Sequence, residues 1–254
     1  MTRIVVIGFN SFRENLREKL LYNLVFFALL LIGSSMLLSR LHLGDDSRLI
    51  LDLGLACINL FGVFIAVFIG IGLVSKEIEK KTIYTIISKP VPRYEFLLGK
   101  YMGLAITLLV NTAIMLAGLL VALSLMNVAV SLLLFKAVLL IVMELMVITG
   151  VALLFSTFTT STLSAIFTVA IYVIGHLTGD LKALGAKLDA GSRAMLTGLY
   201  YLMPNLENFN IKGRVIHSQD VATPEFMMIV AYGLLYTAFL LLLAAVIFQR
   251  RDFR

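Results

Sequence analysis

Long apolar runs alternate with short charged segments along this chain. A helix needs roughly 20 mostly apolar residues to cross the hydrocarbon core of a bilayer. Six segments reach or approach that length, over residues 20–39, 53–75, 101–126, 137–155, 163–178 and 226–248. The predicted fold class is therefore an all-α integral membrane protein with six transmembrane helices, built as a single transmembrane domain over residues 1–254. Six spans place both termini on the same side of the membrane.

The first 19 residues have a different pattern, in which apolar residues recur every three or four positions. They share one helical face, as residues of an amphipathic helix do, and are Val5, Phe9, Phe12, Leu16 and Leu20. Basic residues add positive charge to the same segment. We therefore expect residues 1–19 to form an interfacial helix on the membrane surface rather than a disordered basic arm.

Residues 179–225 form the one sizeable segment outside the predicted spans. Leu181, Leu184 and Leu188 share a helical face, and a second face carries Met195, Leu199 and Leu202. This spacing predicts short external helices between spans five and six. An irregular stretch follows around YLMPNLENFN.

Composition supports the membrane assignment. The chain is 60% hydrophobic and 14% charged, with a mean hydropathy of +1.00, whereas soluble domains are about half apolar and a quarter charged. The net charge of +6 could suggest nucleic-acid binding. The basic residues of a membrane protein instead collect on its cytoplasmic side, so no nucleic-acid partner is expected. The one cysteine, Cys57, cannot form an intrachain disulfide.

The distribution of lysine and arginine predicts the orientation. Residues 1–19, the loop at 76–100 and the C-terminal tail together carry 13 of the 21 Lys and Arg residues. The positive-inside rule places this side, and with it both termini, in the cytoplasm. The first apolar run is too long for a signal peptide, and no small-residue cleavage site follows it. We read it as a retained span in a bacterial or archaeal inner membrane.

The loop at 77–100, EIEKKTIYTIISKPVPRYEFLLGK, is unusually rich in charge for this chain. Ile83, Ile86 and Ile87 are spaced to form an apolar stripe on a short helix. Pro90 and Pro92 would end that helix, because proline removes a backbone donor. Such a stripe with a charged rim suits docking into a groove on a soluble partner. Contact with the lipid surface is an equally good reading of these features alone.

The same segment resembles the signature loop of permeases of the ABC-transporter type-2 exporter class. The resemblance rests on Glu77 and Glu79, the pair Lys81-Thr82, the run Ser88-Lys89-Pro90-Val91-Pro92-Arg93, and Leu98-Gly99-Lys100. The C-terminal FQRRDF is similar to the basic end of this family, and YLMPNLENFN resembles its branch linked to multicopper-enzyme maturation. Pro92 departs from the pattern, since relatives often have a small polar residue there.

This resemblance implies two copies of the permease, as a homodimer or as a pair of similar chains, with two cytoplasmic ABC ATPase subunits. It identifies residues 77–100 as a coupling segment that sits in a cleft of the ATPase. The residues expected to couple to the ATPase are Glu77, Glu79, Lys81, Thr82, Ile83, Tyr84, Ile86, Ile87, Pro90 and Arg93. The lipid bilayer and an external accessory protein are further candidate partners.

The chain has no recognisable phosphate-binding loop of its own. Such a loop needs Gly-x-x-x-x-Gly-Lys followed by Ser or Thr. The nearest candidate, Gly99-Lys100, is followed by Tyr101, and Tyr94 stands where the first glycine should be. We therefore expect a non-catalytic subunit that binds no cofactor, with ATP and Mg on the partner ATPase.

Glu144 is the one acidic residue well inside a predicted span. A charge at the bilayer centre costs about 3 kcal/mol on insertion scales, so such residues usually face protein or a wet cavity. One reading makes Glu144, with Asn111, a cavity-lining or gating residue. The other is a packing hydrogen bond between helices, with Asn111 or Thr149 as the partner.

Two other patterns are less specific. Gly62, Ala66 and Gly70 form a small-residue face that suits close helix packing, either at a dimer seam or within one chain. The histidines, methionines and Cys57 show no metal-ligand spacing, so no metal site is expected.

The sequence thus favours the permease subunit of an ATP-driven exporter or extractor. The alternative is a membrane scaffold that uses the same ATPase to transmit force to an external partner without moving substrate through itself. An ion-coupled carrier would need more intramembrane charge than Glu144 supplies, and usually repeated halves.

Overall fold

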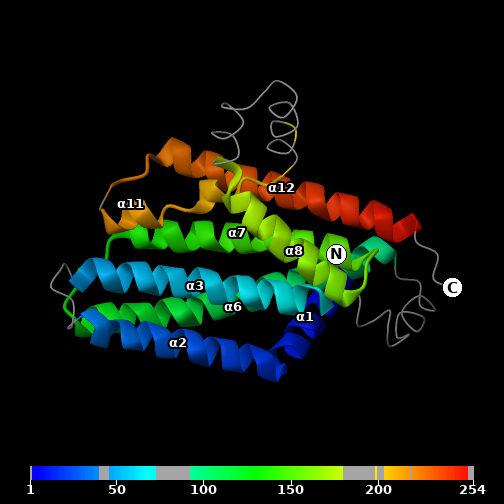
Figure 1. The fold of residues 1–254 in the computed structure, drawn as a ribbon. Helices are drawn as coiled ribbons and strands as arrows, with labels where there is room; N and C mark the ends of the chain where they lie inside the picture. The colour runs from blue at the N-terminus through cyan, green and yellow to red at the C-terminus, as the bar shows by residue number, and fades with distance from the viewer. Residues whose placement is uncertain are drawn as a thin grey trace.

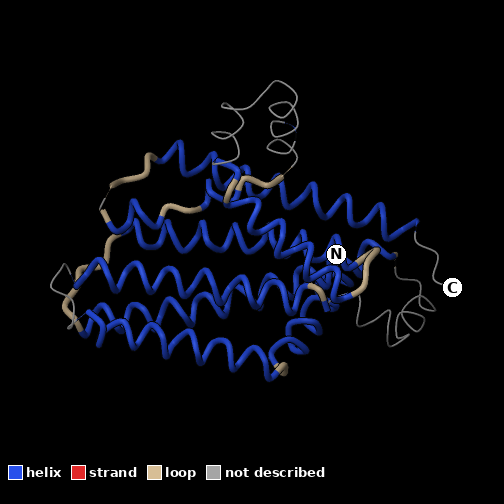
Figure 2. The backbone as a smooth tube through the Cα atoms, viewed as in Figure 1, coloured by secondary structure: helices blue, strands red, loops and turns tan. Residues whose placement is uncertain are grey.

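The computed structural model describes residues 2–39, 46–72, 92–179, 198, 203–217 and 219–250. Within these ranges every regular element is a helix, and no strand occurs (Figure 2). Most of the predicted coupling segment and most of the external segment lie outside these ranges. The two helical faces predicted for the external segment, Leu181/Leu184/Leu188 and Met195/Leu199/Leu202, lie outside them as well.

Nine helical elements are described. They are α1 (Thr2–Leu16), α2 (Lys19–Ser39), α3 (Asp46–Gly70), α6 (Arg93–Leu125), α7 (Leu132–Ser156), α8 (Ser161–His176), the 3₁₀ helix η1 (Leu206–Phe209), α11 (Lys212–Ile216) and α12 (Thr223–Arg250).

The long helices α2, α3, α6 and α7 lie side by side, and α12 packs along α7 (Figure 1). Helix α1, the start of α6 and the end of α12 lie at one end of the bundle, which we name the α1 end. Helix α11 and the start of α12 lie at the opposite end, named the α11 end. Helix α7 is the central helix, because it contacts α3, α6, α8 and α12.

Four helices are long and apolar enough to cross a membrane: Arg48–Gly70, Arg93–Leu125, Leu132–Ser156 and Thr223–Arg250. A fifth span results if α1 and α2, which meet at a 64° bend, count as one. Helix α8 has 16 residues, fewer than the roughly 20 that a straight span needs. The structure therefore gives an all-helical membrane bundle with four to five such spans, and the sixth stays a prediction.

Helix α1 packs on α6 through small residues rather than through its apolar stripe. Val5 and Phe9 of the stripe are 56% and 53% exposed, whereas Gly8, Ser11 and Asn15 on the neighbouring face are buried. Asn15 also donates a hydrogen bond from Nδ2 to Thr107 Oγ1 at 3.2 Å. The stripe predicted from the sequence is thus exposed at Val5 and Phe9 and half-buried at Phe12 and Leu16, and the contact with α6 uses the face beside it.

The small-residue face of α3 packs within the chain. Gly62 lies against the side chain of Leu145, and a methyl group at Gly70 would lie 3.0 Å from Ala152 Cβ. Both contacts are with α7. Gly62 and Gly70 already serve the close approach of α3 to α7, as small residues do between membrane helices. Their contacts therefore favour intrachain packing over a dimer seam.

Adding one methyl group at Gly103 should separate α1 from α6. Its Cβ would lie 2.6 Å from both Gly8 O and Ser11 Cβ, so backbone must move. We expect Gly103→Ala to cost about 1–3 kcal/mol, as overpacking does. The temperature at which buried Cys57 becomes accessible to a thiol-reactive dye measures the loss.

Gly33→Ala is the matched control, because nothing lies within 4 Å of a Cβ at Gly33. Alanine is the better helix former, by about 1 kcal/mol, so this variant should unfold at an unchanged or higher temperature. Equal unfolding temperatures for the two variants would contradict the close packing of α1 on α6.

Candidate functional site

Arg93, the first residue of α6, binds the far end of the chain. Its Nη1 donates hydrogen bonds to Phe248 O and Gln249 O, both at 3.2 Å. These carbonyls belong to the last turn of α12, where a helix has no intrahelical donors left. A positive charge at a helix C-terminus is also favoured by the helix dipole. Arg93 therefore fastens the start of α6 to the end of α12.

Neighbouring side chains extend this connection to α1. The rings of Phe96 and Phe248 stack with centroids 6.3 Å apart. Lys100 lies one turn after Phe96, with Nζ 5.8 Å from the centre of the Phe96 ring. The same Nζ forms an ion pair with Glu14 Oε2 of α1 at 3.2 Å. We name Glu14, Arg93, Phe96, Lys100 and Phe248 the clasp.

Three residues of the clasp, Arg93, Phe96 and Lys100, belong to the last part of the predicted coupling segment, residues 77–100. Of the ten residues expected to couple to the ATPase, Arg93 is described, and the other nine, from Glu77 to Pro90, lie outside the described residues. Reading the sequence did not find Glu14, Phe96 or Phe248. The one available signal was the i, i+4 spacing of Phe96 and Lys100, which puts an aromatic ring beside a cation on one helix face.

A second group of polar side chains lies in the middle of the bundle around Glu144, which is 0% exposed. Its Oε2 accepts a hydrogen bond from Asn59 Nδ2 at 2.8 Å. Its Oε1 lies 3.4 Å from His176 Nε2. Asn59 Oδ1 in turn accepts from the Tyr172 hydroxyl at 3.2 Å. The Glu144 cluster, defined as Asn59, Glu144, Tyr172 and His176, thus joins α3, α7 and α8.

The hydrogen-bond partners expected for Glu144 from the sequence are wrong. Asn111 Nδ2 donates to Thr107 O at 2.7 Å, and Thr149 Oγ1 donates to Leu145 O at 2.7 Å, each within its own helix. The partner is Asn59, near the middle of the span Arg48–Gly70. No sequence signal singled it out, because Asn111 also stands near the middle of its span.

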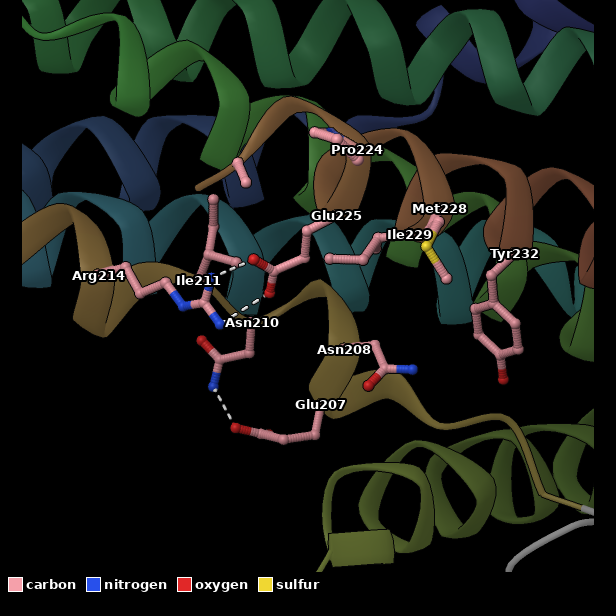
Figure 3. Close-up of a pocket in the computed structure, with 11 residues that line it drawn as sticks. Glu207, Asn208, Asn210, Ile211, Arg214, Pro224, Glu225, Met228, Ile229 and Tyr232 are labelled. Carbon is pink, nitrogen blue, oxygen red and sulfur yellow. Dashed lines mark hydrogen bonds and ion pairs between the residues drawn. The ribbon is translucent and has the colours of Figure 1, made fainter. Parts of the chain in front are cut away.

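A cavity of about 710 Å³ opens at the α11 end (Figure 3). It lies between the η1–α11 segment and the first turns of α12, and neither Glu144 nor Asn111 lines it. Arg214 pairs with Glu225 at 2.8 Å, and Asn210 donates to Glu207 at 3.1 Å. Its walls therefore combine charged and amide groups with apolar side chains.

Lys136 of α7 holds the segment that leads into α12. Its Nζ donates to Asp220 Oδ1 at 3.1 Å and to Val221 O at 3.0 Å. The hydrogen bond from Lys136 lowers the pKa of Asp220 below its usual value. The cavity thus has one wall that is tied to the central helix. Among the described residues, no group of three or more His, Cys, Asp or Glu side chains could hold a metal ion.

Comparison with known families gives one match over nearly the whole chain. A family model described as "ABC-2 family transporter protein" matches residues 8–253. A search of curated proteins found no match. The matched range includes both the clasp residues and the Glu144 cluster.

Removing the Arg93 side chain should loosen the last turn of α12. We expect Arg93→Ala to expose the carbonyls of Phe248 and Gln249, at a cost of about 1.5–3 kcal/mol for hydrogen bonds from a charged donor. Amide hydrogen exchange should then quicken over residues 245–250. Arg214→Gln, which breaks an exposed ion pair at the opposite end, is the control. Unchanged exchange in Arg93→Ala would show that the clasp does not hold α12.

Proposed function

The chain belongs to the ABC-2 family of transporter proteins, and on that premise we propose that it couples ATP hydrolysis by separate ATPase subunits to export or extraction of a substrate. As a member of this family it is the membrane component of an ABC transporter. Its own part in the reaction is mechanical. The nucleotide and its magnesium ion bind to the ATPase, and the permease converts the ATPase motion into helix movement.

The clasp is the observation that carries this proposal. The described chain resumes at Pro92, and Arg93 is the first residue of α6. A push on the coupling segment therefore enters α6 at Arg93. Arg93 is bonded to the end of α12, and Lys100 to Glu14 of α1. One displacement can therefore move three helices together, because the contacts that join them are short and charged. A coupling segment that entered a loosely held helix would lose this motion at the first turn.

In the proposed complex, two permease copies bind two ATPase subunits. The coupling segment docks its stripe of Ile83, Ile86 and Ile87 into a cleft of the ATPase, with Glu77, Glu79 and Lys81 on the rim. The α1 end then faces the cytoplasm of a bacterial or archaeal cell, and α8 forms the fifth of the six spans, predicted over residues 163–178. The excess of basic residues on the segments at that end supports this orientation.

The cavity at the α11 end favours a second candidate function. In that case the permease is a force-transmitting scaffold whose external segment holds a partner protein. The similarity of YLMPNLENFN to the branch linked to multicopper-enzyme maturation supports this version. Part of that stretch, Leu206–Phe209, forms η1 and packs on α7 and α8. A continuous polar path between two permease copies would favour transport, and a sealed apolar seam would favour the scaffold.

Replacing Ile83 and Ile86 together with aspartate should abolish copurification with the ATPase. Two carboxylates would have to be buried in an apolar cleft, which is costly without a partner charge. Membrane insertion should be unaffected, because both positions lie outside the apolar runs. Pull-down of the ATPase with the tagged permease, from membranes with matched permease content, measures the effect.

The control is the double change of Ile83 and Ile86 to valine, which keeps the stripe apolar and should keep the complex. A complex that survives the aspartate pair would refute docking through this stripe. Loss of the complex in the valine pair as well would point to a fold defect rather than to a docking surface.

A further inference from the structure

The Glu144 cluster has more hydrogen-bond acceptors than donors, and the excess lies between His176 and Glu144. His176 Nδ1 lies 3.1 Å from Tyr172 O. A carbonyl oxygen can only accept, so Nδ1 carries the hydrogen of this bond. In a neutral imidazole the other nitrogen, Nε2, is then an acceptor. Nε2 faces Glu144 Oε1 at 3.4 Å, and an ionised carboxylate is also only an acceptor.

Two acceptors facing each other beside a fully buried carboxylate are unfavourable without a hydrogen between them. Glu144 Oε1 is buried and has no hydrogen-bond partner. Glu144 Oε2 is already satisfied by Asn59. One added proton resolves the conflict, either on the carboxyl or on the imidazole, because each then donates to the other across the same 3.4 Å gap.

We propose that Glu144 and His176 form a proton-binding site that holds one shared proton and thereby fastens α8 to α3 and α7. The site is independent of the ATPase and of any transported substrate. The ligand of this site is the proton. The two groups that share it come from different helices, Glu144 from α7 and His176 from α8. Loss of the proton therefore weakens the contact between α7 and α8.

The surroundings of the pair hold few other charges. The charge of Lys212 of α11 acts on Glu144. Burial lowers the pKa of Lys212, while the charges of Glu144, Asp52 and Glu207 oppose that shift. Tyr172 stands beside the His176 ring, with centroids 4.6 Å apart. Helices α6 and α12 carry charges only near their ends, and their tyrosines, Tyr101, Tyr232 and Tyr236, titrate at about pH 10 in an unfolded chain.

The position of the site connects it to the segment at the α11 end. Gly175, next to His176, is buried. A methyl group added at Gly175 would lie 2.8 Å from Pro204 O and 2.7 Å from Leu206 Cγ, so α8 packs closely on this segment. The Thr178 hydroxyl donates to Asn205 Oδ1 at 3.0 Å. The end of α8 therefore carries residues 204–206 with it. Separation of α8 from α7 would move the base of the segment that lines the cavity.

The stability of the protein against pH tests this site. The side chains of glutamate and histidine have pKa values of about 4.3 and 6.5 in an unfolded chain. Above about pH 6.5 an unfolded chain has therefore released the protons of both groups. The folded pair still holds one. Stability falls with rising pH wherever the folded state binds more protons. The wild-type unfolding temperature, followed by dye access to Cys57 in lipid nanodiscs, should therefore fall from about pH 6.5 to 9.

One variant should remove this fall. In Glu144→Gln the side-chain amide donates to His176 Nε2 and still accepts from Asn59, so no proton is needed, and the unfolding temperature should not change over the same pH range. In His176→Gln the buried Glu144 carboxyl loses the group with which it shares the proton, so the fall should move to a different pH rather than vanish. His217→Gln, which removes an exposed histidine outside the cluster, should keep the wild-type dependence.

A wild-type unfolding temperature that stays constant over this range would overturn the proposal. A parallel fall in all four proteins would also overturn it, since the titrating group would then lie elsewhere, at Lys212 for example. If Glu144→Gln fails to fold, a fall in His176→Gln over the same pH range as in the wild type would overturn the sharing of the proton.

Discussion

A bilayer offers no hydrogen-bond partners, so polar groups inside this protein must satisfy one another. The chain meets that constraint at a few points where helices come together. Asn59 and His176 reach Glu144 from α3 and α8, and Asn15 reaches Thr107 from α1 to α6. Apolar side chains against lipid have little preference for one helix over another, so these polar contacts, with the close packing of small residues, select which helices are neighbours.

The clasp follows from the same constraint at the bundle end. The last carbonyls of α12 need donors, and Arg93 supplies them from the start of α6. A guanidinium suits this position because its several N–H groups can serve two carbonyls at once and it keeps its charge at any physiological pH. An interaction that satisfies a helix end also joins α12 to α6, the helix into which the coupling segment continues. Structural need and force transmission are therefore served by one side chain.

The two polar groups differ in what they can do. The clasp lies at the bundle end and contains a partly solvated ion pair, since the Glu14 side chain is 62% exposed, so water and salt moderate it. The Glu144 cluster is more deeply buried, with the Glu144 side chain 0% and the His176 side chain 23% exposed, and a change of one proton there alters contacts between three helices. The first is suited to carry mechanical force. The second is suited to respond to a chemical change, and it lies where α8 meets the segment beside the cavity.

The sequence by itself determined the class of the protein, because hydropathy over roughly 20 residues reports directly on burial in lipid. It also determined the helical stripe of α1 and the resemblance to a transporter family through residues 77–100, a family that the match over 8–253 confirms. Only the tertiary structure decided that α1 packs through Gly8 and Ser11, that Glu144 bonds Asn59, and that Arg93 binds the end of α12. These contacts join residues 85 to 156 positions apart or depend on helix rotation. Periodicity fixes which residues share a face, but it does not say which helix that face will meet.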